Sequence, residues 1–160
     1  MDEVIRIGMA ELAVSQAPMK ITTLGLGSCV GVSIYDLWAR IGGMIHIMLP
    51  YSSMALKSEN PAKFADTGLP LLIERLERLG ASRDRMLAKI VGGAEMFKID
   101  GHDDRLRIGA RNIEAVEQIA QELALRIIAR SVGGNTGKSI VLNIEDGSVQ
   151  IRMINGVVII

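Results

Sequence analysis

Residues 20–49 read KITTLGLGSCVGVSIYDLWARIGGMIHIML, and this stretch decides the fold. It holds three short apolar runs, Lys20–Leu26, Cys29–Tyr35 and Ile41–Leu49, separated by glycine, serine or charged residues. Apolar runs of this length between turn residues are typical of strands. Because the runs are nearly continuous rather than alternating, we expect strands that are covered on both faces.

The residues on either side of this stretch predict one more strand and two helices. The strand is expected over Ile5–Val14. A helix is expected within Pro61–Leu79, where leucines recur at helical spacing and Gly80 follows as a stop. Pro70 either kinks this helix or begins its regular part. A second helix is expected to start after Asn112, a residue type that caps helices well.

The C-terminal part predicts strands again, at Arg126–Arg130, Ser139–Ile144, Ser148–Ile154 and Val157–Ile160. Asn155-Gly156 is a strong signal for a two-residue hairpin turn. Strands at both ends with helices between them predict an α/β or α+β layered sandwich with mixed strand pairing. No repeat, linker or low-complexity stretch interrupts the chain, so we expect a single domain over residues 1–160.

Composition narrows the function classes. The 160 residues carry no net charge and only 3% aromatic residues, which argues against nucleic-acid binding by a basic field or by base stacking. Uncharged runs are too short to span a membrane, and the acidic start at Met1-Asp2-Glu3 does not look like a secretory signal. One cysteine allows no internal disulfide, so a cytoplasmic location is expected.

The most informative local feature is the corner at Gly25-Leu26-Gly27-Ser28-Cys29, where the single cysteine follows two glycines and a serine. Glycine lets the backbone come close to a ligand, and free backbone N–H groups at such a corner can hold an oxyanion. Gly27 and Ser28 are therefore candidates for shaping an oxyanion site beside a nucleophilic Cys29. The alternative is a buried cysteine that acts as a small apolar residue.

His46 lies in an apolar run on the strand that follows Cys29. Adjacent strands can bring the two side chains together, and a neighbouring imidazole can stabilise a thiolate and later donate a proton to a leaving group. The alternative is a core histidine that bonds a backbone carbonyl. A third group is needed to hold the ring, and Thr22 and Thr23 are the nearby hydroxyl residues. His102, in a polar segment, has weak potential as a metal ligand.

Two glycine-rich motifs are not nucleotide sites. Gly25-Leu26-Gly27 lacks the third glycine of the dinucleotide fingerprint, and a strand rather than a helix is expected after it. The segment from Val132 to Ser139 nearly matches a P-loop, but Val132 replaces the first glycine and a strand again follows. A glycine-rich β-turn is the interpretation we favour for this segment.

Taken together, these residues resemble the CheD family, the chemoreceptor glutamine deamidases of chemotaxis. The resemblance covers nearly the whole chain, and its motifs are Thr23–Val30 (TLGLGSCV), His46–Pro50 (HIMLP), Phe64–Thr67 (FADT), Lys89–Phe97 (KIVGGAEMF), Ile108–Asn112 (IGARN) and the Gly133-Gly134 turn. It implies a layered α/β fold like that of bacterial toxin deamidases. It also implies an active site of Cys29, His46 and Thr23, which selects Thr23 over Thr22, with no metal or organic cofactor.

The resemblance further implies the reaction and the partners. Receptor glutamine side chains are expected to be hydrolysed to glutamate and ammonia through a thioester on Cys29. Methyl-accepting chemotaxis receptors are the expected substrates, and a CheC-type phosphatase is the expected partner. Two alternatives remain at this level: a non-catalytic adaptor for receptor or phosphatase, and hydrolysis of receptor glutamyl methyl esters by the same three residues.

Overall fold

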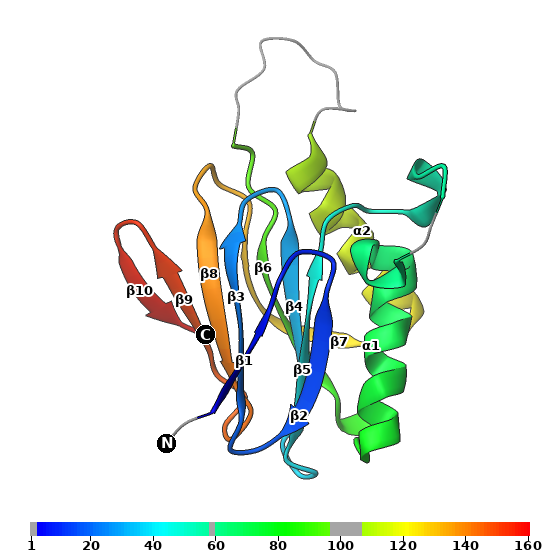
Figure 1. The fold of residues 1–160 in the computed structure, drawn as a ribbon, viewed down its shortest axis with the longest axis vertical. Helices are drawn as coiled ribbons and strands as arrows, with labels where there is room; N and C mark the ends of the chain where they lie inside the picture. Colours follow the sequence, from blue (N-terminus) through cyan, green and yellow to red (C-terminus); the bar gives the residue numbers. More distant parts are fainter. Residues whose placement is uncertain (1–2, 58–59, 97–106) are drawn as a thin grey trace.

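The computed structural model describes residues 3–57, 60–96 and 107–160. This part of the chain forms two five-stranded sheets and two α-helices in three layers (Figure 1). The outer sheet has the strand order β1-β3-β8-β9-β10, and the middle sheet has the order β2-β5-β4-β6-β7. The helices α1 and α2 cover the far side of the middle sheet (Figure 1). The predicted layered α/β sandwich is therefore confirmed.

The strands of the outer sheet are β1 (Val4–Ile7), β3 (Lys20–Leu26), β8 (Lys138–Asn143), β9 (Val149–Met153) and β10 (Gly156–Ile159). Those of the middle sheet are β2 (Leu12–Gln16), β4 (Val30–Asp36), β5 (Ile41–Ile47), β6 (Leu87–Gly92) and β7 (Arg126–Val132). The helices are α1 (Ala65–Leu79) and α2 (Ile108–Glu122), with short 3-10 turns at Ser52–Met54, Pro61–Lys63 and Arg83–Arg85. Both sheets mix parallel and antiparallel pairs, as the sequence predicts.

The strands β4 and β5 are buried along their whole length, as their continuous apolar runs predict. Successive side chains of a strand point to opposite faces. Val30, Val32 and Ile34 of β4 therefore pack in the core under the helices, whereas Tyr35 packs in a second core between the two sheets. In β5, Ile45 and Ile47 face the helices and Met44 faces the outer sheet. The middle sheet thus separates two apolar layers.

The expectation of one strand over Ile5–Val14 is wrong. The chain forms β1 in the outer sheet, turns at residues 8–11, and enters β2 in the middle sheet. Ala10 takes a positive φ of 60° in this turn, and the Glu11 carboxylate accepts a hydrogen bond of 2.6 Å from the Gly8 amide. Apolar residues on both sides of the break hide it in the sequence.

The strand β6 was not among the predicted elements. Lys89 interrupts its apolar pattern in the sequence, yet this side chain is buried between the sheets. Its ammonium donates a hydrogen bond of 2.9 Å to the Gly147 carbonyl and lies 5.4 Å from the centre of the Tyr35 ring. The amphipathic lysine stem therefore fills an inward position that the sequence pattern assigns to an apolar residue.

The first helix agrees with its predicted position in part. It ends at Leu79, and Gly80 follows with a φ of 120°, as the stop signal indicates. It begins at Ala65, after a 3-10 turn at Pro61–Lys63, so Pro70 lies inside the helix and does not begin it. Leu72 and Leu76 are buried as expected.

The second helix begins four residues before the predicted N-cap. Its first residue is Ile108, and Asn112 lies inside the helix and is fully buried. The residue before the helix, Arg107, makes no side-chain cap. One of the free N–H groups of the first turn, that of Ala110, instead donates a hydrogen bond of 3.0 Å to the carboxylate of Glu95. The group that caps α2 is therefore the carboxylate of Glu95, which is 13 positions before the first helical residue, Ile108.

The glycine-rich segment between β7 and β8 connects two strands, as predicted, and the strand β8 rather than a helix follows it. Gly133 and Gly134 have positive φ angles of 82° and 74°, and the turn leads from β7 in the middle sheet to β8 in the outer sheet. The predicted hairpin joins β9 and β10, but its two turn residues are Ile154 and Asn155, one position earlier than expected. Within the described ranges, neither helix is long and apolar enough to cross a membrane.

Candidate active site

Cys29 lies in the short connection that leads from β3 in the outer sheet to β4 in the middle sheet. The carbonyls of the three residues in this connection are all held by hydrogen bonds. The Gly27 carbonyl accepts from the Ala94 amide at 2.8 Å, and the Cys29 carbonyl accepts from the Gly93 amide at 2.8 Å. The Ser28 carbonyl accepts from the Asn112 side chain at 2.9 Å. The backbone around Cys29 is thus fixed on its acceptor side.

The amides of the same three residues are different. Within residues 3–57, 60–96 and 107–160, no acceptor receives a hydrogen bond from the amides of Gly27, Ser28 or Cys29. A run of backbone N–H groups that is fixed in direction and lacks protein partners can bind an anion. The oxyanion site at Gly27 and Ser28 stays a prediction, and these amides are the groups that would form it.

Thr23 and His46 meet between the two sheets. Thr23 is on the inward face of β3 and His46 is on the inward face of β5, and both are fully buried. Thr23 Oγ1 lies 2.7 Å from His46 Nδ1. Thr22 points the other way and donates a hydrogen bond of 2.7 Å to the Ile140 carbonyl. Of the two threonines that the residues alone leave open, only Thr23 contacts the ring.

The hydrogen bonds of Thr23 define the tautomer of His46. The Thr23 hydroxyl lies 2.9 Å from the Ile7 carbonyl, which accepts and cannot donate, so the single hydroxyl proton goes to Ile7. Towards His46 the hydroxyl then acts as acceptor, so Nδ1 carries the ring proton. The Nε2 atom of the neutral ring is therefore unprotonated. It is buried and, among the described residues, has no hydrogen-bond partner.

Cys29 and His46 occupy the same face of the middle sheet. His46 lies directly opposite Gly31 in the β4–β5 pair, and Cys29 precedes Gly31 by two residues. Cys29 is partly buried and packs against the core between the sheets, the layer that also holds His46. No hydrogen bond joins the Cys29 thiol to the unpartnered Nε2 of the ring in this structure.

Burial acts on both titratable groups. It raises the pKa of the Cys29 thiol above its ordinary value, because desolvation disfavours the thiolate. It lowers the pKa of His46 below its ordinary value, because desolvation disfavours the imidazolium. At neutral pH the resting pair is therefore a thiol and a neutral imidazole. That a neighbouring imidazole stabilises the Cys29 thiolate stays a prediction.

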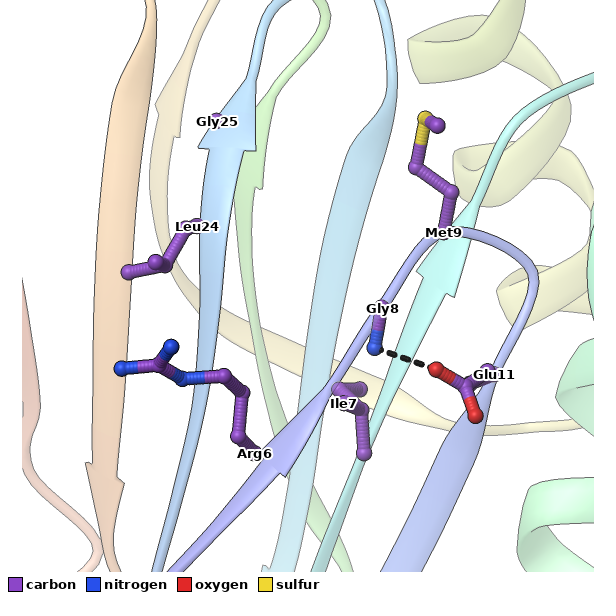
Figure 2. A pocket seen from close by; sticks show the side chains of 7 residues that line it. All are labelled: Arg6, Ile7, Gly8, Met9, Glu11, Leu24 and Gly25. Carbon is purple, nitrogen blue, oxygen red and sulfur yellow. Dashed lines mark hydrogen bonds between the residues drawn. The ribbon is translucent and has the colours of Figure 1, made fainter.

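An open pocket of about 590 Å³ lies at the turn from β1 to β2, next to Leu24 and Gly25 of β3 (Figure 2). Its lining residues come from β1, the following turn and β3: Arg6, Ile7, Gly8, Met9, Glu11, Leu24 and Gly25. Figure 2 shows Arg6 and Leu24 side by side, with Glu11 turned back to the Gly8 amide. Thr23, Cys29 and His46 do not line this pocket, so it does not contain the candidate site.

Asn112, which the sequence predicts to be a helix N-cap, instead contacts the backbone next to Cys29. Its side-chain amide donates hydrogen bonds to the Ser28 carbonyl at 2.9 Å and to the Met48 carbonyl at 3.0 Å. No local pattern reveals this role, because both acceptors are backbone atoms far away in the sequence. His102, the weak metal-ligand candidate, lies outside the described residues. Among the side chains that are described, no cluster of three His, Cys, Asp or Glu residues is suited to a metal ion.

The fold and the site define a class of protein: a layered α/β sandwich with a cysteine, a histidine and a threonine gathered between its two sheets. A solved crystal structure of a Neisseria meningitidis protein has a similar fold, with a TM-score of 0.53 over 83% of this chain and 64% of that one. The two sequences are only 9% identical, so this likeness concerns the fold alone.

The sequence comparisons identify the family. Residues 48–153 match the family model described as CheD chemotactic sensory transduction. A Halalkalibacterium halodurans protein named chemoreceptor glutamine deamidase CheD is 47% identical over 97% of this chain and 96% of its own length. A Lachnoclostridium phytofermentans protein named "Probable chemoreceptor glutamine deamidase CheD" is 46% identical, over 96% of both chains. The chain belongs to the CheD family.

Proposed function

We propose that this protein is a glutamine deamidase acting on chemotaxis receptors, with its active site in one domain over residues 1–160. The names of its relatives support the reaction and the substrate. The observation that carries the assignment of residues is the contact of 2.7 Å between Thr23 and His46, which leaves an unprotonated Nε2 on the face that also carries Cys29. This is the arrangement of a nucleophile, a general base and an orienting group.

The first half of the reaction forms a thioester. His46 Nε2 takes the thiol proton as the Cys29 sulfur attacks the side-chain carbonyl carbon of a glutamine. The negative charge that develops on the carbonyl oxygen is held by the free amides of Ser28 and Cys29. The imidazolium then gives its proton to the amide nitrogen, the carbon–nitrogen bond breaks, and ammonia leaves. Thr23 accepts from Nδ1–H throughout and keeps the ring in place.

The second half hydrolyses the thioester. A water molecule enters, gives a proton to His46 Nε2 and attacks the thioester carbon, with the same amides holding the oxyanion. The carbon–sulfur bond breaks, the sulfur regains the proton from His46, and glutamate is released. In this scheme the base must be neutral at the start of each half. The lowered pKa of His46 favours that neutral form.

The test uses purified full-length protein and the cytoplasmic fragment of a receptor that contains glutamines. Mass spectrometry measures conversion of glutamine to glutamate by the wild type, by Cys29→Ala and by His46→Gln. Both variants are expected to lose the activity while keeping a cooperative thermal unfolding transition. Conversion by Cys29→Ala at the wild-type rate contradicts the thioester mechanism. No conversion by the wild type, together with retained receptor binding, identifies a non-catalytic adaptor.

Two finer parts of the proposal need their own measurements. A CheC-type phosphatase is proposed as the partner, and co-purification or calorimetric titration with such a phosphatase tests it. The chemistry of Cys29 and His46 also suits glutamyl methyl esters, because methanol then leaves in place of ammonia. Methanol release from a methylated receptor fragment distinguishes that activity from deamidation. We place both reactions in the cytoplasm, where the receptor helices are located.

A further inference from the structure

Asn112 is a buried amide whose donors are both in use. It lies inside α2, one turn after the helix begins, and is fully buried. Its Nδ2 donates to the carbonyls of Ser28 and Met48, at 2.9 and 3.0 Å. Both neighbours only accept, so the nitrogen and not the oxygen of the carboxamide must face them.

The bond to Ser28 determines the direction of the Cys29 amide. The Ser28 carbonyl and the Cys29 N–H belong to one planar, trans peptide unit, so they point in opposite directions. When Asn112 holds the carbonyl oxygen on the α2 side, the N–H of Cys29 is turned to the opposite side. That N–H is one of the amides without a protein acceptor among the described residues.

The bond to Met48 connects the same side chain to the strand of the histidine. Met48 follows β5 directly and is two residues beyond His46. One carboxamide therefore joins the loop that carries Cys29 to the end of the strand that carries His46. The two segments adjoin β4 and β5, which are neighbours in the middle sheet, and Asn112 of α2 holds them together from the helix side of this sheet.

Asn112 also carries a cost. Its Oδ1 is buried and has no hydrogen-bond partner within the described part of the chain. An unpartnered buried acceptor opposes folding, whereas the nitrogen of the same carboxamide satisfies the Ser28 and Met48 carbonyls.

We propose that Asn112 is a positioning residue for the deamidation reaction: it aims the Cys29 amide at the developing oxyanion. This inference rests on the proposed function. Asn112 touches no substrate atom and acts through the peptide unit between Ser28 and Cys29.

The test compares Asn112→Asp, which keeps the shape but removes both donors, with Asn112→Ser, which keeps one shorter donor. The turnover number kcat is expected to fall about 10- to 100-fold in Asn112→Asp, the range for a misplaced reacting group, and less in Asn112→Ser. KM is expected to stay within about two-fold, because the side chain is buried and misses the substrate. Val116→Ala, buried on the same helix, controls for lost stability.

Alkylation of Cys29 by iodoacetamide supplies the second measurement. This substitution forms no oxyanion, so a variant with a misdirected amide keeps its alkylation rate within about two-fold while deamidation falls. A structural role instead lowers both rates together, since a collapsed loop misplaces the sulfur as well.

Three results overturn the inference: an unchanged kcat in folded Asn112→Asp, a proportional fall of deamidation and alkylation, or failure of both Asn112 variants to fold while Val116→Ala folds. The last result assigns Asn112 to stability alone. The Cys29→Ala variant distinguishes failure of the proposed function from failure of the proposed role of Asn112. If it deamidates as fast as the wild type, the proposed function itself fails, whereas an inactive Cys29→Ala beside a fully active Asn112→Asp rejects only the role of Asn112.

Discussion

Thr23 Oγ1 and His46 Nδ1 form a hydrogen bond of 2.7 Å that joins β3 of the outer sheet to β5 of the middle sheet. Both side chains are fully buried, so water does not compete for this bond. The Ile7 carbonyl accepts the hydrogen bond of the Thr23 hydroxyl and thereby determines which ring nitrogen of His46 is protonated. The state of the proposed base is therefore set by a backbone atom of β1.

Replacing Thr23 by valine removes the hydroxyl and keeps the shape. Nδ1–H of His46 then loses its acceptor, and the preferred tautomer is no longer selected. We expect kcat for deamidation to fall about 10- to 100-fold, a part of the effect typical of general acid–base catalysis. Thr23→Ser is expected to restore most of the rate. Thr22→Val is the matched control, since it also loses a buried hydrogen bond on β3 but leaves His46 untouched. Equal rates in the two valine variants contradict the role of Thr23.

The pH dependence of kcat/KM follows from the two pKa directions. Protonation of His46 removes the base, and because its pKa lies below the ordinary 6.5, activity is expected to persist below pH 6.5 before it declines. The pKa of the Cys29 thiol lies above the ordinary 9.0, so alkylation of the free enzyme by iodoacetamide is expected to keep rising beyond pH 9.0. Measuring kcat/KM and the alkylation rate from pH 5 to pH 10 checks the decline at low pH and the rise at high pH. An alkylation rate that is already constant at pH 7 indicates a preformed thiolate and contradicts this scheme.

Gly92 supports the Cys29 connection from β6. A Cβ at this position collides with the Cys29 carbonyl oxygen, and the φ of 114° is itself unfavourable for any residue with a side chain. Gly92→Ala is therefore expected to displace the connection, lower kcat at least about 10-fold and lower the melting temperature. Gly156→Ala, in the β9–β10 hairpin, has a φ of 144° but open space around the new Cβ.

The comparison of these two alanine variants separates backbone strain from the collision. Both variants place a side chain at a positive φ, which is unfavourable, but only the new Cβ of Gly92→Ala collides with the Cys29 carbonyl. Gly156→Ala is expected to keep its rate within about two-fold while losing some thermal stability. A similar loss of kcat in both variants assigns the effect to general destabilisation and rejects the specific role of Gly92.

The sequence predicted the parts of the fold that depend on local patterns. β4 and β5 were predicted because strands buried on both faces read as continuous apolar runs. The split of β1 from β2 was not predicted, since one glycine and apolar neighbours do not reveal a change of sheet. β6 was missed because Lys89 looks like a surface residue, although a backbone carbonyl and an aromatic ring accommodate its ammonium inside.

The site was predictable to the extent that it follows strand alternation. The residues alone left Thr22 and Thr23 open, since a shift of one residue exchanges the two faces of a strand. The structure places only Thr23 against His46. The role of Asn112 was hidden because its acceptors are carbonyls, which carry no sequence signal. The start of α2 was misplaced for a related reason, since its capping carboxylate, that of Glu95, is distant along the chain.

The position of the site between two sheets has a mechanical consequence. The proposed base, His46, belongs to the middle sheet, and Thr23, which orients it, belongs to the outer sheet. A small displacement of one sheet relative to the other therefore lengthens the hydrogen bond between Thr23 and His46. The turnover number kcat then depends on how the two sheets are aligned. Core side chains between the two sheets, such as Leu142 and Ile144, are then expected to influence the reaction rate.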